Sequence, residues 1–245
     1  MQTRRNVSVV TGAARNIGAA ISARLVSDGW TVIAIDRDGD ALTRMCDELG
    51  GSAVAVTADL AVEDPIQLAA RLHDSYGLIN GFVANAGVTT TGSFLDLSPG
   101  DFDHVLAVNV RSHFFMAQAF ARHLVTSRES GSFVFMSSVH QDIRRGHPHY
   151  AASKAAVAAI VREAAAELGP HGIRVNAVAP GFTTADDSRS DPLAVHATPI
   201  GRPVRPDEIA DVVAYLLSPK AAAVNGANWA IDGGLSTHSW VDHMA

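Results

Sequence analysis

The chain has 245 residues, of which 47% are hydrophobic, and this length and composition suit one large α/β domain with a sizeable core. Its 25 acidic and 19 basic side chains give a net charge of −6, which disfavours nucleic acid as a partner. The single cysteine excludes an intramolecular disulfide and favours a reducing, cytoplasmic location. No apolar run approaches the roughly 18 residues of a membrane span, so we expect no membrane partner. The short apolar stretch near the N-terminus runs into a glycine turn and does not have the pattern of a signal peptide.

Apolar, β-branched runs alternate with segments of helical spacing along the whole chain. We predict strands within 6–11, 31–36, 52–60, 78–87, 131–138, 172–180 and 226–232. We predict helices at 17–27, 39–50, 65–76, 99–126, 149–168 and 205–218. The alternation predicts a single-domain, Rossmann-like, doubly wound α/β fold over residues 1–245, with about seven parallel strands and helices on both faces. Residues 182–204 are rich in proline, and we expect them to form a substrate lid with at most a short helix.

The segment TGAARNIG, at 11–18, connects the first predicted strand to the first predicted helix. Gly12 permits a tight turn, and Gly18 permits close packing or the close approach of a phosphate. The helix N-terminus behind the turn supplies amide donors and a partial positive charge. A glycine pair alone is explained equally well by a structural turn. Asp36 ends the next strand, however, where a carboxylate accepts hydrogen bonds from both hydroxyls of an adenosine ribose, so the combination predicts a nucleotide site.

The charges near this turn bear on the choice of cofactor. The Asp36 carboxylate repels a 2′-phosphate and so favours NAD over NADP. Arg15 and Arg37 act in the opposite direction, because a guanidinium binds a phosphate well. For Arg37, a solvated charge at a strand end is the simpler interpretation. We therefore predict NAD as the cofactor and NADP as the less favoured alternative.

The segment YAASK places Tyr150 and Lys154 four residues apart in a predicted helix, on one face. A free tyrosine has a pKa of about 10, too high for a good base at neutral pH, and a nearby ammonium lowers that value. In isolation, such a pair is more often a packed phenol and a solvated lysine. Ser138 at the end of the preceding strand, Asn109 and the glycine turn change that balance. Together they predict proton transfer coupled to hydride transfer at the carboxyl edge of the sheet.

In this order and spacing, the motifs resemble those of the short-chain dehydrogenase/reductase family in its short single-domain form, across essentially the whole chain. The matching segments are TGAARNIG (11–18), AD (58–59), NAG (85–87), VNV (108–110), MSSVH (136–140), YAASK (150–154), VNAVAPG (175–181), TPIGRPVRPDEIA (198–210) and IDGG (231–234). The tyrosine-to-lysine spacing differs from that of the enoyl reductase branch. Arg15 differs from the glycine found there in the extended epimerase branch.

The resemblance implies a role for each matching residue. Tyr150 is the catalytic acid or base, Lys154 lowers its pKa and holds the nicotinamide ribose, and Ser138 orients the substrate oxygen. Ser137 is the alternative to Ser138, but the SSVH run favours Ser138. Asn109 bends the fourth helix and holds a water that relays protons to Lys154. The predicted cofactor-binding residues, those of the glycine turn included, are Gly12, Arg15, Asn16, Ile17, Gly18, Asp36, Arg37, Asp59, Leu60, Asn85, Ala86, Gly87, Tyr150, Lys154, Pro180, Gly181 and Thr183.

Two positions depart from the family pattern. Asn16 replaces the usual middle glycine of the first turn, and we expect the turn to survive because asparagine tolerates a left-handed backbone. Ala185 stands where the family usually has a threonine that contacts the cofactor. Thr183 and Thr184 are the alternatives for that contact.

These observations predict an NAD(H)-dependent oxidoreductase that interconverts a secondary alcohol and a ketone in a small molecule. The substrate classes considered are a sugar, a polyol, a hydroxy acid or another small carbonyl compound. An NADPH-dependent ketone reductase of a biosynthetic pathway is the first alternative, and a non-catalytic nucleotide-sensing protein is the second. The 11 histidines show no C-x-x-C or H-E-x-x-H pattern, so we predict no metal. The resemblance implies a homotetramer, or a homodimer. The alanine-rich helix of residues 151–159 and the long fourth helix build the dimer, and two dimers join through the last strand.

Overall fold

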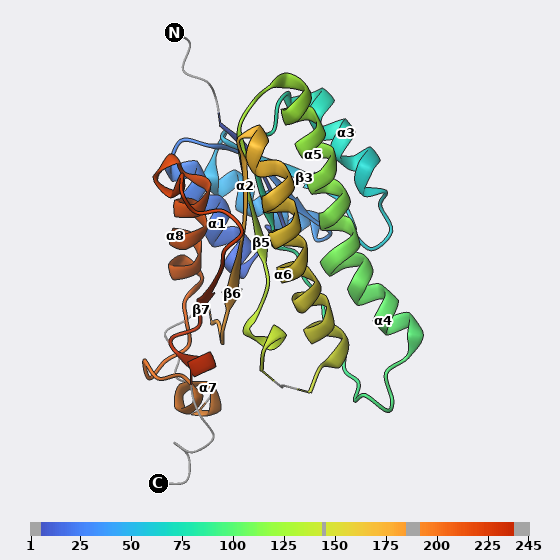
Figure 1. The fold of residues 1–245 in the computed structure, drawn as a ribbon, viewed down its shortest axis with the longest axis vertical. Helices are drawn as coiled ribbons and strands as arrows, with labels where there is room; N and C mark the ends of the chain where they lie inside the picture. The colour runs from blue at the N-terminus through green and yellow to red at the C-terminus, as the bar shows by residue number, and fades with distance from the viewer. Residues whose placement is uncertain (1–5, 144–145, 185–191, 238–245) are drawn as a thin grey trace.

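The structure, a computed structural model, describes residues 6–143, 146–184 and 192–237, which contain a seven-stranded sheet (Figure 1). The strands are β1 (Val7–Thr11), β2 (Thr31–Asp36), β3 (Ala53–Thr57), β4 (Gly81–Ala84), β5 (Gly131–Met136), β6 (Ile173–Pro180) and β7 (Asn228–Ile231). Their order is β3-β2-β1-β4-β5-β6-β7, and neighbouring strands are parallel. The predicted doubly wound α/β fold is confirmed. The strand order changes direction at β1, where ligands bind in such sheets.

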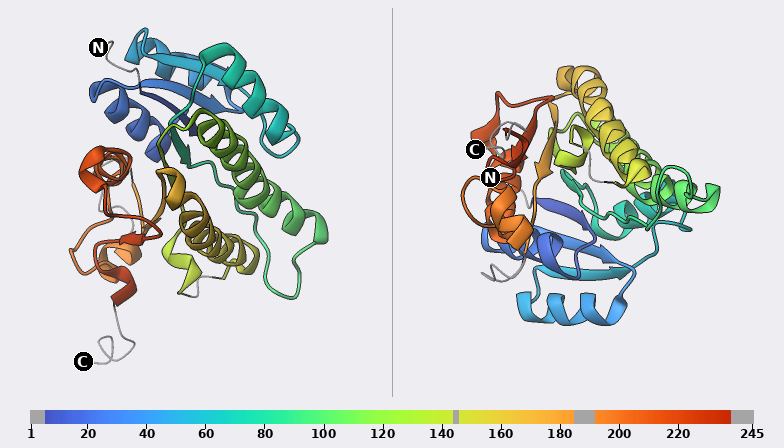
Figure 2. Two further views of the ribbon diagram at one scale, coloured as in Figure 1. Left: turned by 45° about the horizontal axis from the view of Figure 1, so that its top comes forward. Right: turned by 90° about the horizontal axis from the view of Figure 1, so that it is seen from below.

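Helices cover both faces of the sheet, as the two further views make clear (Figure 2). One face carries α1 (Asn16–Ser27), α2 (Gly39–Leu49) and α8 (Pro206–Leu217). The other face carries α3 (Pro65–Tyr76), α5 (His113–Ser127) and α6 (Pro148–Leu168). Among the helices that the structure describes, none is long and apolar enough to cross a membrane.

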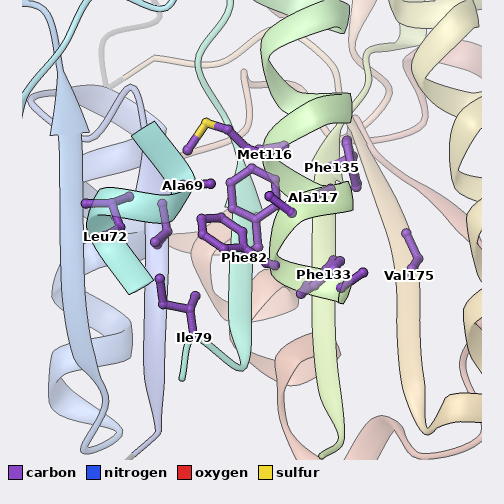
Figure 3. Packing of buried hydrophobic residues seen from close by; sticks show 14 of the residues in the cluster. Ala69, Leu72, Ile79, Phe82, Met116, Ala117, Phe133, Phe135 and Val175 are labelled. Atoms are coloured by element: carbon purple, nitrogen blue, oxygen red, sulfur yellow. The ribbon is translucent and has the colours of Figure 1, made fainter. Parts of the chain in front are cut away.

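A cluster of phenylalanine rings fixes β4 and β5 against α5 (Figure 3). The Phe82 ring lies 5.3 Å from that of Phe120, and 6.0 Å from those of Phe133 and Phe135, each measured between centroids. All three pairs are edge-to-face, the arrangement that aromatic quadrupoles favour. The packing therefore sets where the carboxyl ends of these strands lie relative to α5.

The long helix predicted over 99–126 is interrupted. The structure has α4 (Pro99–Leu106), a π-helical turn (Ala107–Ser112) and then α5. Asn109 lies within the π turn, at the position where the resemblance implies a bend. Hydrophobic periodicity does not reveal such a turn, because it changes the backbone hydrogen bonds and not the residue types. π turns inside α-helices are frequent at functional sites.

Two predicted segments differ from the structure or lie partly outside it. The strand predicted within 78–87 extends only over Gly81–Ala84, because the Asn85 N–H turns to the Thr11 hydroxyl, 3.0 Å away. Of the predicted lid, residues 185–191 lie outside the described residues. The described part contains a short helix, α7 (Pro192–Ala197), and a β-bridge between Thr183 and Val204.

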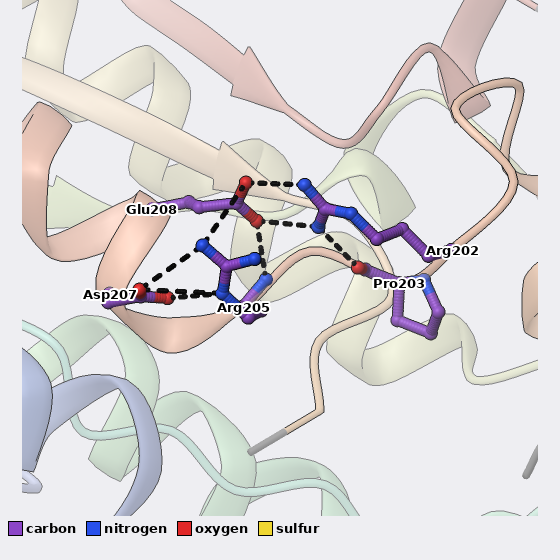
Figure 4. A network of polar contacts seen from close by, with 5 residues as sticks. All are labelled: Arg202, Pro203, Arg205, Asp207 and Glu208. Carbon is purple, nitrogen blue, oxygen red and sulfur yellow. Dashed lines mark hydrogen bonds and ion pairs between the residues drawn. The ribbon is translucent and has the colours of Figure 1, made fainter. Parts of the chain in front are cut away.

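An ion-paired network marks the beginning of α8 (Figure 4). The Arg202 guanidinium donates to both carboxylate oxygens of Glu208, at 2.6 and 2.8 Å. Glu208 also accepts the Arg205 N–H at 2.9 Å, and Arg205 pairs with Asp207. The hydrogen bonds from Arg202 and the Arg205 backbone lower the pKa of Glu208 to about 2. The network joins the end of the predicted lid segment to α8.

Candidate active site

The glycine turn has the backbone that the sequence predicts. Gly12 has φ of 63° and Asn16 has φ of 49°, both in the left-handed region. The turn therefore tolerates Asn16 as expected. A Cβ on Gly18 would lie 2.0 Å from the Gly12 carbonyl oxygen, and one on Gly12 would lie 2.8 Å from Ala86 Cα. Both glycines are required because backbone passes close to them.

Side chains from β1 and β4 hold the glycine turn in place. The Asn85 side-chain amide donates to the carbonyl oxygens of Thr11 and Gly12, at 2.8 and 3.0 Å. The Thr11 hydroxyl accepts the N–H groups of Asn85 and Ala86, both at 3.0 Å. Sequence reasoning assigned no role to Thr11. The turn is thus bound to both neighbouring strand ends.

The first turn of α1 and the end of β2 offer complementary groups. Among the described residues, the Arg15 side chain makes no capping hydrogen bond to α1 and is ion-paired with Asp38 instead. The first amides of α1 therefore lack a side-chain cap and can donate to an anion. The Asp36 carboxylate accepts the N–H groups of Ala14 and Asp38, both at 3.1 Å, and keeps further acceptor sites. These groups fit the phosphates and the ribose of a dinucleotide.

A cavity of about 360 Å³ opens at the carboxyl ends of β1, β2 and β4. It is lined by Gly12, Arg15, Asn16, Ile17, Gly18, Ile35, Asp36, Arg37, Ala58, Asp59, Leu60, Asn85, Ala86, Gly87, Val88 and Val108. Sequence reasoning missed the apolar members Ile35, Ala58, Val88 and Val108, because an apolar lining has the same pattern as a core.

The other predicted cofactor-binding residues fall outside this lining. Pro180 ends β6, and a Cβ on Gly181 would lie 2.7 Å from Asp232 Cβ, so Gly181 lets the chain pass close to the end of β7. The Thr183 hydroxyl is directed to the Gly181 carbonyl oxygen at 3.3 Å. Tyr150 and Lys154 lie on α6, which follows β5 in the chain.

One turn of α6 separates Tyr150 from Lys154. The Lys154 side chain is 3% exposed, and its Nζ donates to the Met136 carbonyl oxygen at 2.7 Å. The same Nζ lies 5.5 Å from the centroid of the Tyr150 ring. A Cβ on Gly87 would lie 3.5 Å from it, so Lys154 adjoins the end of the dinucleotide cavity.

The charges in this part of the site differ from the expectation. Burial raises the pKa of the Tyr150 phenol above its ordinary value, and a hydrogen bond with Ser138 acts in the opposite direction. Burial also lowers the pKa of Lys154 to about 8. The resemblance implies a lowered pKa for Tyr150, but here desolvation of the phenolate outweighs the neighbouring groups. A low phenol pKa therefore requires additional positive charge beside the ring.

The two candidate serines point in different directions, as expected for successive residues at a strand end. The Ser137 hydroxyl lies 3.1 Å from the Val178 carbonyl oxygen and 2.8 Å from Asn228 Oδ1, towards β6 and β7. The Ser138 hydroxyl accepts the His140 N–H at 3.2 Å and interacts with the Tyr150 phenol, whose pKa it acts to lower. Of the two serines, Ser138 is the one that interacts with the phenol, so it stays the predicted catalytic serine.

The Asn109 side chain ties the π turn to its surroundings. Its Oδ1 accepts the Val88 N–H at 2.8 Å, and its Nδ2 donates to the Val88 carbonyl oxygen at 2.9 Å. Nδ2 also donates to the Ser153 hydroxyl at 3.0 Å. Ser153, between Tyr150 and Lys154, was not predicted to contribute. Its contact links the π turn directly to α6.

Histidines gather around the phenol. The His140 ring is edge-on to the Tyr150 ring, with centroids 5.2 Å apart. His149 is 1% exposed and accepts the Thr90 N–H at 3.3 Å. Among the described residues, Nδ1 of His147 and Nδ1 of His149 are buried without a hydrogen-bond partner. Among all the residues that the structure describes, no group of three or more His, Cys, Asp or Glu side chains is placed to hold a metal ion.

A cavity at the switch point of a doubly wound sheet, with a buried lysine next to its lining and a serine and a tyrosine near that lysine, is typical of a nicotinamide-dependent oxidoreductase. A family model described as enoyl-(acyl carrier protein) reductase matches residues 12–236. A (3R)-3-hydroxyacyl-CoA dehydrogenase of Rattus norvegicus is 36% identical over an alignment 256 positions long, which covers 96% of this chain and 98% of the relative. The chain belongs to the short-chain dehydrogenase/reductase family, which acts on hydroxyl and keto groups with NAD or NADP.

Solved structures agree with this assignment. Acetoin dehydrogenase from Enterobacter cloacae superposes with a TM-score of 0.90 and 28% identity, over 98% of both chains. A protein from Agrobacterium tumefaciens, described as a 2-deoxy-D-gluconate 3-dehydrogenase with NADP bound, superposes with a TM-score of 0.86 and 31% identity. The match covers 96% of this chain and 98% of that one. The relatives differ in substrate, so they define the reaction type more closely than the molecule acted on.

Proposed function

We propose that this oxidoreductase uses NAD(H) to interconvert a secondary alcohol and a ketone, with Tyr150 as the acid or base. The observation that supports this most directly is the meeting of three groups: the Tyr150 phenol, the Ser138 hydroxyl and the buried Lys154 ammonium. Of the three, the Lys154 ammonium lies beside Gly87, which lines the cavity at the carboxyl ends of β1, β2 and β4. The proposed substrate is a sugar, polyol, hydroxy acid or other small carbonyl compound.

Each group has a defined task in the proposed reaction. The bound nicotinamide accepts or supplies the hydride and, when oxidised, brings positive charge to the site. Tyr150 donates a proton to the ketone oxygen in reduction and removes it from the alcohol in oxidation. Ser138 donates a hydrogen bond to the same oxygen, and Lys154 favours the phenolate. Asn109 is proposed to hold the water through which Lys154 exchanges protons.

The proposed cofactor contacts follow the cavity. The first amides of α1 and the turn residues from Gly12 to Gly18 hold the phosphates. Asp36 holds the adenosine ribose, Asp59 and Leu60 the adenine. The remaining proposed contacts, towards the nicotinamide, are Asn85, Ala86, Gly87, Tyr150, Lys154, Pro180, Gly181 and Thr183.

Two contacts support NAD over NADP. The Asp36 carboxylate lines the cavity, and the Arg15 guanidinium is already paired with Asp38. A relative with NADP bound supports the alternative, an NADPH-dependent ketone reductase.

Calorimetric titration with NAD and NADP side by side tests this choice, followed by a screen of alcohols and ketones at the nicotinamide absorbance. We expect NAD to bind at least about tenfold more tightly, or roughly 1.4 kcal/mol. Asp36→Asn should close most of that gap, because it removes the charge and keeps the shape. Asp103→Asn, at an exposed carboxylate on α4, should leave it unchanged. Equal or tighter binding of NADP would overturn the choice of NAD.

The assembly and domain assignments are also proposals. We propose one domain over residues 1–245 with a lid over 182–204, in a cytoplasmic homotetramer or homodimer. An apolar groove of about 680 Å³ between α5 and α6, lined by Phe114, Ala121 and Ile160 among others, supports a second copy as the occupant. Light scattering measures the assembly, and a monomer at micromolar concentration would contradict it.

A further inference from the structure

His113 is the first residue of α5, directly after the π turn that contains Asn109. It is 2% exposed and makes a polar contact at each ring nitrogen. Its Nδ1 lies 3.3 Å from the Asn109 carbonyl oxygen, and its Nε2 lies 3.0 Å from the Thr11 hydroxyl. A carbonyl oxygen only accepts, so Nδ1 carries the proton and Nε2 accepts from the Thr11 hydroxyl. The two partners thereby assign one tautomer to the ring.

The ring stays neutral. Burial and, to a smaller extent, the Lys154 ammonium lower the pKa of His113 to about 3, and the hydrogen bond to Asn109 acts in the opposite direction. His113 is therefore uncharged at any pH where the enzyme works. It supplies two fixed hydrogen bonds and does not act as an acid or a base.

The groups that His113 connects belong to the two parts of the site. The Thr11 hydroxyl also accepts the N–H groups of Asn85 and Ala86, and so helps to hold the glycine turn in place. Asn109 is hydrogen-bonded to Ser153, which lies between Tyr150 and Lys154 on α6. Thr11 and His113 are 102 positions apart in the chain. The buried His113 ring thus connects the glycine turn, through Thr11, with Asn109, which is hydrogen-bonded to the helix that carries Tyr150 and Lys154.

We propose that His113 is a positioning residue that aligns the dinucleotide turn with Asn109, and through Asn109 with the Tyr150–Lys154 pair. The proposal rests on the proposed oxidoreductase function. Misplacement by about 1 Å of a group that orients a reaction lowers the rate by up to about a hundredfold. A ring that only filled space beside Phe82, whose ring centroid lies 6.3 Å away, would be replaced best by an apolar side chain.

Three substitutions separate alignment from packing. His113→Leu keeps the approximate volume and loses both hydrogen bonds. His113→Asn keeps a donor at the position of Nδ1, and His113→Gln keeps an acceptor at the position of Nε2. Ser112→Ala is the matched control, because it removes another buried hydroxyl of the π turn, one that donates to the Val108 carbonyl oxygen at 2.7 Å.

We expect His113→Leu to lower kcat at least tenfold and to shift the midpoint of its pH profile by half a unit or more. His113→Asn should recover much of kcat, and His113→Gln should recover the affinity for NAD(H) more than kcat. Ser112→Ala should leave the pH profile unchanged. Packing alone predicts the reverse order, with leucine better tolerated than the smaller asparagine. A wild-type kcat and pH midpoint in His113→Leu would overturn the proposal.

Two further measurements distinguish a failure of the His113 proposal from a misfolded variant and from a failure of the proposed oxidoreductase function. Thermal unfolding identifies a variant that does not fold, and the asparagine and glutamine variants then decide the question by comparison with each other. If the wild-type protein turns over no alcohol or ketone, the proposed function fails. Alignment is then judged by calorimetry with NAD, where His113→Leu should weaken binding at least fivefold and His113→Gln should restore it. Unchanged NAD affinity in both would overturn the proposal by itself.

Discussion

The two parts of the site satisfy their polar groups in different ways. Around the glycine turn, Asn85 and Thr11 supply hydrogen bonds that fasten the backbone, and Asp36 accepts two amides. Around the phenol, Lys154 is buried with a pKa of about 8, and the pKa of Tyr150 is raised. The dinucleotide part is therefore fixed by its own contacts, whereas the catalytic part carries buried polar groups against a desolvation penalty.

The buried histidines next to Tyr150 in the sequence add to this difference between the glycine turn and the surroundings of the phenol. Nδ1 of His149 is buried without a partner among the described residues, and an unsatisfied buried donor costs about 1–3 kcal/mol. A buried polar group without a hydrogen-bond partner requires an explanation, and a catalytic role is one of them. We expect changes near the glycine turn to weaken stability and NAD binding together, and changes near the phenol to lower activity without weakening NAD binding to the same extent.

The largest effect that tests this comparison is expected from Tyr150→Phe. The substitution keeps the ring against His140 and removes the group that transfers the proton. Turnover should fall by about 10²–10⁴-fold, the usual contribution of a general acid or base. NAD affinity should stay within about threefold, because the dinucleotide part is held separately. Steady-state rates at the nicotinamide absorbance and calorimetry measure the two quantities.

Tyr215→Phe is the matched control, since this tyrosine is exposed on α8 and its hydroxyl donates to the Lys220 carbonyl oxygen at 3.4 Å. It should leave turnover unchanged. If Tyr150→Phe kept its turnover, the phenol would not be the acid or base. A biological function that survives Tyr150→Phe would point to the nucleotide-sensing alternative.

A smaller effect, on stability as well as binding, is expected from Gly18→Ala. The new Cβ would lie 2.0 Å from the Gly12 carbonyl oxygen and 2.7 Å from Asn85 Nδ2, so the fastened turn must move. We expect a loss of about 2–4 kcal/mol in the free energy of unfolding, and at least tenfold weaker NAD binding. Urea denaturation and calorimetry measure both.

Gly100→Ala, in α4, provides the control, because its nearest neighbour would lie 3.9 Å from the new Cβ. It should change stability by less than about 1 kcal/mol and in the stabilising direction. Normal NAD binding by Gly18→Ala would show that the turn is less rigid than its hydrogen bonds indicate.

The comparison also explains which features could be predicted from the sequence. The glycine turn, Asp36 and the Tyr150–Lys154 pair are local patterns whose residue types are strongly restricted by backbone geometry or chemistry, so the sequence displays them directly. The strand and helix order follows from alternating periodicity. The prediction of Ser138 over Ser137 depends on the SSVH run, which is also a local pattern.

Other features depend on contacts that no local pattern contains. His113 has the same helical spacing as any buried residue, and its partner Thr11 is distant in the chain. The π turn around Asn109 changes hydrogen bonding without changing the hydrophobic pattern. The raised pKa of Tyr150 depends on burial in three dimensions, which the proximity of Lys154 in sequence does not reveal.

The smallest effect on stability is expected from replacing Glu208, a carboxylate that is hydrogen-bonded to its arginine partners but partly exposed to solvent. The hydrogen bonds from Arg202 and the Arg205 backbone hold its pKa at about 2, below the ordinary value of about 4.3. A lowered pKa in the folded state means that the carboxylate stabilises the fold above the unfolded value. That stabilisation is lost as the pH falls from about 4.3 towards 2. The Glu208 side chain is 31% exposed, so solvent screens the pair, and Glu208→Gln should cost only about 1 kcal/mol at pH 7.

Urea denaturation at pH 7, 5 and 3 measures this difference between the wild-type protein and Glu208→Gln. The gap should be full at pH 7, nearly full at pH 5 and clearly smaller at pH 3, because only in the wild-type protein does the unfolded Glu208 carboxyl bind a proton that the folded carboxylate does not. Glu48→Gln, at an exposed position of α2, should show a small gap that does not depend on pH in this way. A constant gap for Glu208→Gln would mean that the network acts through neutral hydrogen bonds. A gap that closes with acid would show that a charge compensated by its partners stabilises the fold, in contrast to the buried, poorly compensated groups around Tyr150.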